Sequence, residues 1–211
     1  MQEKRRKFKR QSAEERKQAL VQATLDLVAE QGVQAATVRA ISERAEVTQG
    51  LIRHYFSTKE ELILAAYEFH MNALTDQASA AAEAEHDSAR GKLAGFIRAS
   101  LKPPVVDPRA LALWAGFMTM LLQDPAMRQI HERSYVYFRN RLQALIAEAL
   151  TEAGKTVSEP WLRGLAIACN AVVDGLWLEG GALPEAFGDE ELPKIGLEAV
   201  GAIIDLPLDL R

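Results

Sequence analysis

The sequence predicts an all-α protein of nine helices, in which a small N-terminal helical domain precedes a larger C-terminal one. Apolar residues recur every three or four positions along most of the chain, which is typical of amphipathic helices, and no alternating strand pattern stands out. Glycine and proline are sparse and lie between the periodic stretches. With 211 residues, of which 48% are hydrophobic, the chain is long enough to bury a core.

The first four helices are predicted from the residues that cap them. A side-chain oxygen at the N-cap accepts a hydrogen bond from a free N–H of the first turn, and a glutamate three residues later completes a capping box. Gly32 is expected to end the first helix. The expected N-caps are Ser12 with Glu15, Thr37, Thr48, and Ser57 with Glu60.

Five further helices are predicted in the remainder of the chain. We expect them at about Ser88 to Leu101, Pro108 to Leu122, Pro125 to Ala153, Glu159 to Leu178 and Asp189 to Ile204. Proline and glycine mark the breaks between them, because neither residue favours a helix interior. The expected breaks are Pro103-Pro104, Asp124-Pro125, Gly154 and Gly180-Gly181.

Positive charge is concentrated in the N-terminal part. Residues 1–60 contain 12 Lys and Arg against 8 Asp and Glu, whereas the remainder contains 13 against 21. A basic head on an acidic body favours contact of the head with a polyanion. The alternative is that the basic run at the start of the chain is only a solvated arm.

Cysteine content and hydropathy favour a cytoplasmic protein. The single cysteine, Cys169, cannot form an internal disulfide, and we expect it to be a small buried hydrophobe. No segment reaches the roughly 20 continuous apolar residues of a membrane span. The nearest, Leu162 to Leu178, is interrupted by Arg163, Asn170 and Asp174. We therefore expect no membrane partner.

Residues 37–56, TVRAISERAEVTQGLIRHYF, have the outline of a helix-turn-helix. Two short helices are joined by a turn and can pack through apolar side chains such as Ile41, Val47 and Ile52. In such a motif the second helix enters the major groove of DNA.

The stretch from Arg16 to Leu64 resembles the DNA-binding domain of the TetR family. The matching runs are G-V-x-x-A-T-V-x-x-I, A-x-V-T-x-G-x-I and H-Y-F-x-x-K-E-E-L. Two positions depart from the family: Glu46 stands where a turn glycine is usual, and Arg53 where many relatives carry tyrosine. The resemblance implies a dimeric repressor that binds palindromic double-stranded operator DNA and is released by a small molecule.

Side-chain chemistry suggests a role for each exposed residue of this motif. Gln49 can pair with adenine and Arg53 with guanine, although a solvated helix charge is the alternative for Arg53. Gly50 allows close approach of the backbone, and Thr48 lies at a helix N-terminus that favours a phosphate. Following the resemblance, phosphate contacts are expected from Thr37, His54, Tyr55 and Lys59, and Arg39 completes the predicted DNA-binding set. Thr37 and Thr48 are also expected as helix caps, and Tyr55 as half a core residue.

The last two helices are predicted to form the dimer interface. The helix from Glu159 to Leu178 is apolar on more than one side, and a helix buried on two faces needs a second partner. Pairing with the final helix would give a four-helix interface, as the resemblance also implies. The predicted organisation is a basic arm over residues 1–12, a DNA-binding domain over 13–60, and a ligand-binding and dimerisation domain over 61–211.

Asp174 and a group of aromatic residues predict an effector pocket. A carboxylate among apolar neighbours is costly unless it is paired. Either a Lys or Arg of the protein neutralises Asp174, or a cationic ligand does so beside the ring faces of Trp114 and Trp177. The predicted ligand-binding residues are Trp114, Phe117, Tyr135, Phe138, Asp174 and Trp177.

A second resemblance points to the same class of ligand. The runs A-L-A-L-W-A-G-F and D-G-L-W-L, with V-T-x-G-x-I-x-H-Y-F, resemble the choline-responsive repressors of glycine betaine synthesis. This implies a quaternary ammonium effector such as choline. The alternative for most of the aromatic residues is a place in the core.

Other classes of function find little support. His131-Glu132 begins like a zinc-protease motif, but Tyr135 occupies the position of the second histidine. Phosphate-binding loops, dinucleotide fingerprints and nucleophile elbows are missing from the sequence. We therefore expect no catalytic residues, metal or cofactor. A helical adaptor and a transcriptional activator remain as alternatives.

Overall fold

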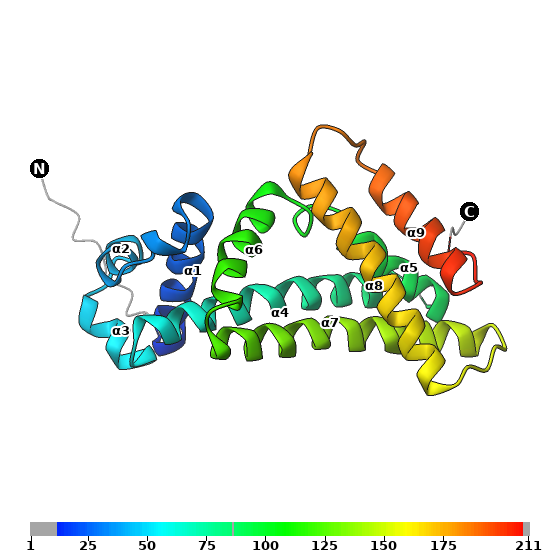
Figure 1. The fold of residues 1–211 in the computed structure, drawn as a ribbon, viewed down its shortest axis with the longest axis horizontal. Helices are drawn as coiled ribbons and strands as arrows, with labels where there is room; N and C mark the ends of the chain where they lie inside the picture. Colours follow the sequence, from blue (N-terminus) through cyan, green and yellow to red (C-terminus); the bar gives the residue numbers. More distant parts are fainter. Residues whose placement is uncertain (1–11, 86, 209–211) are drawn as a thin grey trace, which may run out of the picture. The chain divides into compact units, whose positions relative to one another are not determined.

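The computed structural model describes residues 12–85 and 87–208, and over these residues it contains nine α-helices, one short 3₁₀ helix and no strand (Figure 1). The all-α prediction is confirmed. The basic arm expected over residues 1–12 lies, apart from Ser12, outside the described residues. The chain divides into two compact units, Met1–Ala66 and Tyr67–Arg211, which are considered separately below.

The first unit is built from three α-helices, a short 3₁₀ helix and the beginning of a fourth α-helix. They are α1 (Ala13–Gln31), the 3₁₀ helix η1 (Val33–Ala35), α2 (Val38–Arg44), α3 (Gln49–Phe56) and the start of α4 (Lys59–Glu85). Leu20, Val28, Ile41, Ile52 and Phe56 are buried between these helices. The short α2 and α3 are therefore held against α1 by apolar packing, since helices this short are not stable alone.

Two of the four predicted caps form hydrogen bonds as expected. Ser12 and Glu15 make the reciprocal capping box of α1. Gly32 ends that helix with a φ of 81°, a conformation that favours glycine. The Thr37 hydroxyl caps α2 by accepting the N–H of Ala40 at 3.2 Å.

The other two caps differ from the prediction. Thr48 occupies the N-cap position of α3, but its hydroxyl makes no capping hydrogen bond within the described residues. The prediction of Ser57 as the cap of α4 is wrong, because its φ of 47° is incompatible with the extended backbone of an N-cap. Thr58 caps the helix instead and accepts the N–H of Glu61 at 3.0 Å.

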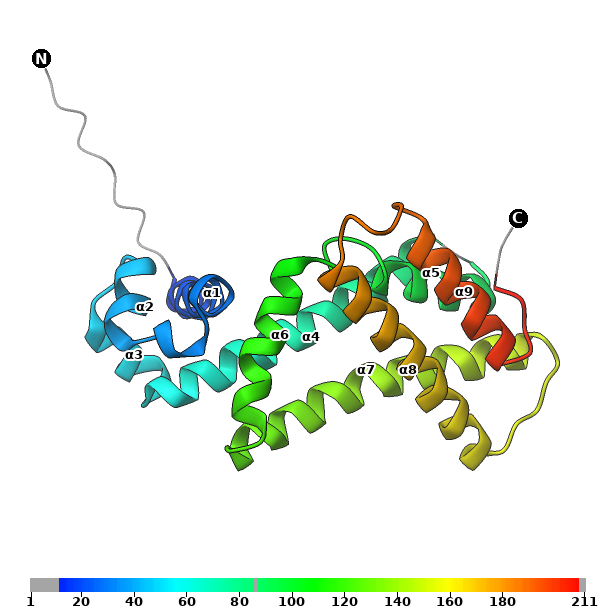
Figure 2. The same ribbon diagram turned by 45° about the horizontal axis from the view of Figure 1, so that its top comes forward.

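The second unit contains the remainder of α4 and five further helices. They are α5 (Ala89–Ser100), α6 (Pro108–Leu121), α7 (Pro125–Glu152), α8 (Glu159–Ala182) and α9 (Glu191–Ile203). α7 packs against α5 and α8, and α9 packs against α5 and α8. Figures 1 and 2 show α8 crossing α7 with α9 beside it. The predicted boundaries of α5, α6 and α7 are met within one residue.

Gly180 and Gly181 do not break α8, which was a wrong prediction. The helix continues through both and ends at Ala182. A Cβ atom at Gly180 would lie 2.5 Å from Leu192 Cδ1 and 2.7 Å from Val106 Cγ1. These glycines therefore allow close packing of helices rather than a change of direction.

α8 has an inner and an outer face. Leu165 and Cys169 are buried in the core, whereas Trp161, Ile167 and Leu178 are exposed. Among the described residues α8 is also the one helix that is long and apolar enough, by length and composition, to cross a membrane, and 33% of that window is buried. This criterion is looser than the uninterrupted apolar run sought in the sequence. The outer face lacks a neighbour within the protomer's described residues.

Candidate functional site

The exposed face of α3 carries the residues predicted to read DNA. Ile52 and Phe56 point into the core, so Gln49, Gly50 and Arg53 are left exposed on the other side of the helix. Gln49 and Arg53 are four residues apart and hence lie on one face. The Gly50 position is open, with no atom within 4 Å of a Cβ built there.

Further polar groups flank this face within the first unit. Thr37 and His54 are exposed, and Lys59 is partly exposed with its Nζ 3.6 Å from Glu60 Oε1. Arg39 Nε lies 2.8 Å from Glu43 Oε1, with 80% of the Arg39 side chain accessible. An ion pair in solvent contributes little, so this guanidinium can exchange its partner for a phosphate.

Tyr55 is oriented by a residue that sequence reasoning missed. The Nε of Arg16 donates to the Tyr55 hydroxyl at 3.3 Å, and the ring of His54 stands edge-on to that of Tyr55 at 4.8 Å. Arg16 therefore fixes the Tyr55 hydroxyl and adds a positive charge beside it. Neither cap nor periodicity singles out Arg16, because the contact joins α1 to α3 across 39 positions of sequence.

The turn between α2 and α3 has a strained residue at the position where the sequence departs from the family. Glu46 adopts a φ of 54°, the left-handed region that glycine occupies without steric cost. The backbone around it is hydrogen-bonded, with the Val47 N–H donating to the Ser42 carbonyl at 3.0 Å. The turn thus keeps a geometry suited to glycine although glutamate occupies it.

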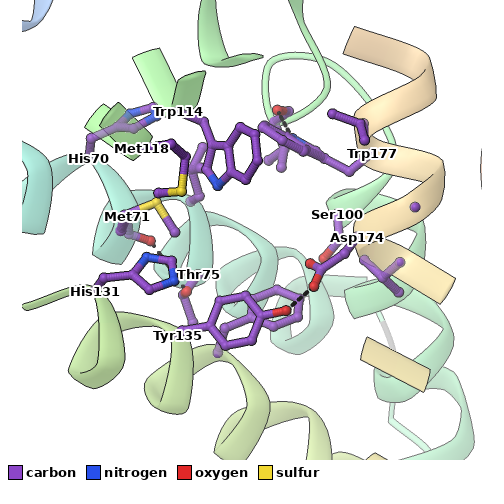
Figure 3. Close-up of a pocket in the computed structure, with 16 residues that line it drawn as sticks. His70, Met71, Thr75, Ser100, Trp114, Met118, His131, Tyr135, Asp174 and Trp177 are labelled. Carbon is purple, nitrogen blue, oxygen red and sulfur yellow. Dashed lines mark hydrogen bonds between the residues drawn. The ribbon is translucent and has the colours of Figure 1, made fainter. Parts of the chain in front are cut away.

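The second unit contains a cavity of about 390 Å³ lined by residues of α4 to α8 (Figure 3). A volume of this size is typical of small-molecule sites. The lining residues are His70, Met71, Leu74 and Thr75 of α4, Ser100 of α5, Val105 before α6, Trp114 and Met118 of α6, His131, Tyr135 and Phe138 of α7, and Val173, Asp174, Gly175, Trp177 and Leu178 of α8. Most of these side chains are apolar or aromatic.

The cavity brings together the predicted ligand-binding residues except Phe117. Trp114, Tyr135, Phe138, Asp174 and Trp177 line it. Phe117 is fully buried instead, and its ring packs against that of Tyr67 at 4.9 Å. The physical reason is helical phase: Phe117 follows the buried residues Ala110 and Leu113 of α6 by seven and four positions, on the face turned away from the cavity.

Asp174 has polar partners but no cationic one. Its Oδ2 accepts hydrogen bonds from the Tyr135 hydroxyl and, at 2.8 Å, from Asn170 Nδ2. Neither Lys nor Arg pairs with it in the part of the chain described, and Oδ1 receives no hydrogen bond there. Burial raises the pKa of Asp174 above its ordinary value, while the hydrogen bonds from Tyr135 and Asn170 act in the opposite direction.

Aromatic rings surround this carboxylate. The indoles of Trp114 and Trp177 meet edge to face with centroids 6.1 Å apart, and Trp177 Nε1 donates to the Val105 carbonyl at 2.8 Å. Burial and the neighbouring carboxylate raise the pKa of Tyr135 to about 12, so its hydroxyl stays protonated. In Figure 3 the indoles lie on one side of the cavity and Tyr135 on the other, with Asp174 at the end. A carboxylate beside π faces is suited to an organic cation.

Several lining residues were missed in the sequence. Met71 and Thr75 on α4 are spaced by four and so share a helix face, and His131 on α7 has the same spacing from Tyr135, which was predicted. This spacing is a usable signal once the face has been recognised as a pocket wall. His131 was instead considered only as a metal ligand.

Two family models match the chain. Residues 20–66 match the model described as bacterial regulatory proteins of the TetR family. Residues 89–205 match the C-terminal domain of the BetI-type transcriptional repressors. The second match alone spans more than half of the chain.

Individual relatives agree with the family models. The chain is 30% identical to the HTH-type transcriptional regulator BetI 2 of Chromohalobacter salexigens, covering 83% of this chain and 82% of the relative. Among solved structures, a transcriptional regulator from Pseudomonas aeruginosa PAO1 is 31% identical, with a TM-score of 0.80 over 94% of this chain and 93% of that one. A regulator from Saccharomonospora viridis, solved in complex with choline, shares the fold at 16% identity, with a TM-score of 0.71 over 88% of this chain and 95% of that one.

Proposed function

The chain belongs to the TetR family of transcriptional regulators and carries a BetI-type C-terminal domain, and from this premise we propose that an organic ammonium compound releases it from its operator. The protein is a DNA-binding repressor, not an enzyme. One observation carries the proposed effector class: Asp174 is a largely buried carboxylate in an aromatic cavity, and the described residues offer it no cation.

Desolvation of Asp174 makes a bound cation favourable. Removing a carboxylate from water is costly, and an opposite charge at close range offsets the cost. An alkylammonium satisfies this need at Oδ1 and also gains from the ring faces of Trp114 and Trp177. The choline complex of the Saccharomonospora viridis regulator supports the same ligand class. The cavity of about 390 Å³ also admits ammonium compounds with larger substituents.

We assign DNA recognition to residues 13–60. Gln49 and Arg53 are the proposed base-reading residues, because they share the exposed face of α3 and their side chains can form paired hydrogen bonds in the major groove. The proposed backbone contacts are Thr37, Arg39, Thr48, Gly50, His54, Tyr55 and Lys59. Such contacts position a protein on DNA without reading sequence.

We assign effector binding and dimerisation to residues 61–211, with the dimer formed through α8 and α9. The outer face of α8 supports this, because Trp161 and Ile167 are exposed beside small residues such as Ala168 and Ala171. Small residues let two helices approach closely, and a second copy would cover this apolar face. A regulator that binds DNA is expected in the cytoplasm.

The helix α4 offers a direct mechanical route from effector to DNA. It is continuous from Lys59, a proposed phosphate contact, to cavity-lining residues such as Met71 and Thr75. An effector that favours a different position of this helix shifts the protein towards a state unable to bind the operator. The free energy of this shift is set by the ratio of the effector's affinities for the two states.

A mobility-shift experiment tests the proposal. The DNA upstream of the gene and of its neighbours is incubated with the protein and titrated with choline, betaine aldehyde, larger quaternary ammonium compounds and, as matched controls, neutral and anionic compounds of similar size. We expect a specific complex that only the ammonium compounds release. Release by neutral or anionic compounds alone would reject the ammonium effector and leave the repressor assignment in place.

A further inference from the structure

His131 lines the cavity but takes no part in the ammonium site proposed above. It projects from α7 and lines the cavity together with Tyr135, whose ring stacks on the imidazole with centroids 5.5 Å apart. Its Nδ1 is hydrogen-bonded to the Tyr67 hydroxyl at 2.6 Å. Its Nε2 has no hydrogen-bond partner among residues 12–85 and 87–208, and the side chain is only half-buried, so this nitrogen stays accessible from the cavity. Figure 3 shows the ring at the cavity wall between Met71 and Tyr135.

Tyr67 determines which nitrogen of His131 carries the proton. Tyr67 is fully buried, and its hydroxyl has no other hydrogen-bond partner in the described chain. If Nδ1 were protonated and donated to Tyr67, the phenolic hydrogen would be left buried without an acceptor, which is unfavourable. The favoured arrangement has Tyr67 donating to Nδ1, so the hydrogen of the neutral imidazole is on Nε2.

His131 is neutral at physiological pH in this setting. Burial lowers its pKa below the ordinary value, and the opposing effect of Asp174 is smaller. Burial also raises the pKa of Tyr67, which keeps the phenol protonated as the donor to Nδ1. The cavity therefore presents a carboxylate oxygen from Asp174 and a free N–H from His131.

We propose that His131 recognises an oxygen atom of the effector through Nε2–H, so that the effector is an ammonium compound with a hydrogen-bond acceptor close to its charge. This inference rests on the ammonium site proposed above. Tyr135 sets the separation, since its ring stacks on His131 while its hydroxyl bonds to Asp174. The two recognition points therefore lie at opposite ends of the Tyr135 side chain. A linker of a few atoms between nitrogen and oxygen spans this separation, as in an amino alcohol, an amino aldehyde or an amino acid.

Trp114 supports the same ligand chemistry. Its indole nitrogen has no hydrogen-bond partner within the residues described, and the ring forms part of the cavity wall. A second donor next to the cavity is thus available to an acceptor on the ligand. Trp177, by contrast, has already given its N–H to the Val105 carbonyl.

The tautomer is tested without any effector. Nitrogen-15 NMR of histidine-labelled protein distinguishes the two neutral imidazole forms, and the signals of His131 are identified by their loss in His131→Gln. We expect the Nε2–H form in the wild type and a mixture of tautomers in Tyr67→Phe. The Nδ1–H form in the wild type would overturn the proposal whatever the effector proves to be.

A pair of ligands tests recognition of the oxygen. Choline and n-propyltrimethylammonium have the same cationic head and similar size, but only choline carries an oxygen. Calorimetric titration of the wild-type protein should show about tenfold tighter binding of choline, in the range expected for one additional hydrogen bond. His131→Leu should bind both ligands equally, whereas His131→Gln, which keeps an N–H donor, should retain part of the preference.

Asp174→Asn distinguishes failure of this inference from failure of the ammonium site. We expect the variant to bind both ligands more weakly by a similar factor and to keep the preference for choline. Equal binding of both ligands by the wild type, with a clear loss in Asp174→Asn, would reject oxygen recognition by His131 and leave the ammonium site intact. Binding of neither ligand would reject both.

Discussion

At the scale of single residues, the ionised form of Asp174 lowers the folding stability of the ligand-free protein. Its pKa is raised in the folded protein, so the folded state holds its proton more strongly than the unfolded chain does. Stability from this group is therefore greatest at low pH and declines as the pH rises past the ordinary carboxyl pKa towards the raised one. A carboxylate retained at such a position is consistent with a ligand that compensates for its charge.

Replacement of Asp174 by asparagine is expected to stabilise the ligand-free protein. Asn keeps an acceptor for Tyr135 and Asn170 but removes the buried charge. We expect the melting temperature at neutral pH to rise by about 2–4 °C, which corresponds to roughly 1 kcal/mol for a protein of this size. The gap between variant and wild type should narrow as the pH falls. Thermal unfolding between acidic and neutral pH measures it, and a less stable variant at neutral pH would contradict the account.

Glu46 is expected to be replaceable by glycine with a gain in stability. Its φ of 54° is unfavourable for a residue with a Cβ atom, so Glu46→Gly should raise the free energy of unfolding by about 1 kcal/mol. Denaturant unfolding measures the change. The matched control is Glu43→Gly in the last turn of α2, which should lower stability because glycine weakens a helix and the exposed ion pair with Arg39 is lost. A Glu46→Gly variant less stable than the wild type would show that the Glu46 side chain makes a contact that compensates for its positive φ.

Site residues could be predicted from the sequence where the neighbouring residues alone make them energetically unfavourable. Asp174 and the two tryptophans were found because a carboxylate among apolar residues is unfavourable in any fold. Phe117 was misplaced because Trp114 and Phe117 are only three positions apart, yet fall on the cavity and core sides of α6. The role of His131 could not be predicted, since it depends on Tyr67, which lies 64 positions away in the sequence.

At the scale of elements, the proposed base-reading residues lie on α3, and the proposed phosphate contact Lys59 begins α4. Gln49→Ala or Arg53→Ala should cost about 1–3 kcal/mol of operator affinity and relax the preference at particular base pairs. Lys59→Ala should instead weaken binding to all DNA sequences by a similar factor. It should also reduce the slope of the logarithm of affinity against the logarithm of salt concentration by about one. Competition with single-base operator variants at several salt concentrations measures both effects. Unchanged base preference in both α3 variants would mean that another segment reads the operator.

The outer face of α8 makes a separate prediction about assembly. Ala171→Glu places a carboxylate on the exposed small-residue face, so it should weaken the proposed dimer at least tenfold while leaving the protomer folded. Analytical ultracentrifugation across a range of concentrations measures the change. Ala80→Glu, at an exposed alanine of α4, is the matched control and should leave the dimer unaffected. Equal behaviour of the two variants would exclude this face from the interface.

Helix ends were predictable where they depend on neighbouring residues and were missed where they depend on packing. The Ser12 box and the Thr37 cap follow from local hydrogen bonds. The N-cap of α4 is Thr58 rather than the predicted Ser57, because Ser57 has a positive φ at the end of α3. The continuation of α8 through Gly180 depends on Leu192 and Val106, which the local sequence does not reveal.

At the scale of the whole molecule, α4 connects the proposed DNA contacts with the proposed effector site. The charge distribution agrees with this division, because the basic part of the sequence carries the proposed DNA contacts and the acidic part encloses a site for a cation. A symmetric dimer would present two reading helices to a palindromic operator, with half-sites about one helical turn of DNA apart. Coupling then requires that the effector and the operator favour different states of the same protein.

The most direct test of the central claim is the operator affinity of wild type and Asp174→Asn, measured by fluorescence anisotropy with and without a saturating ammonium effector. We predict equal affinity of the two proteins without effector, a loss of about tenfold or more for the wild type when effector is added, and little loss for Asp174→Asn at the same concentration. The same loss in both proteins would contradict the claim that Asp174 holds the effector that releases the repressor.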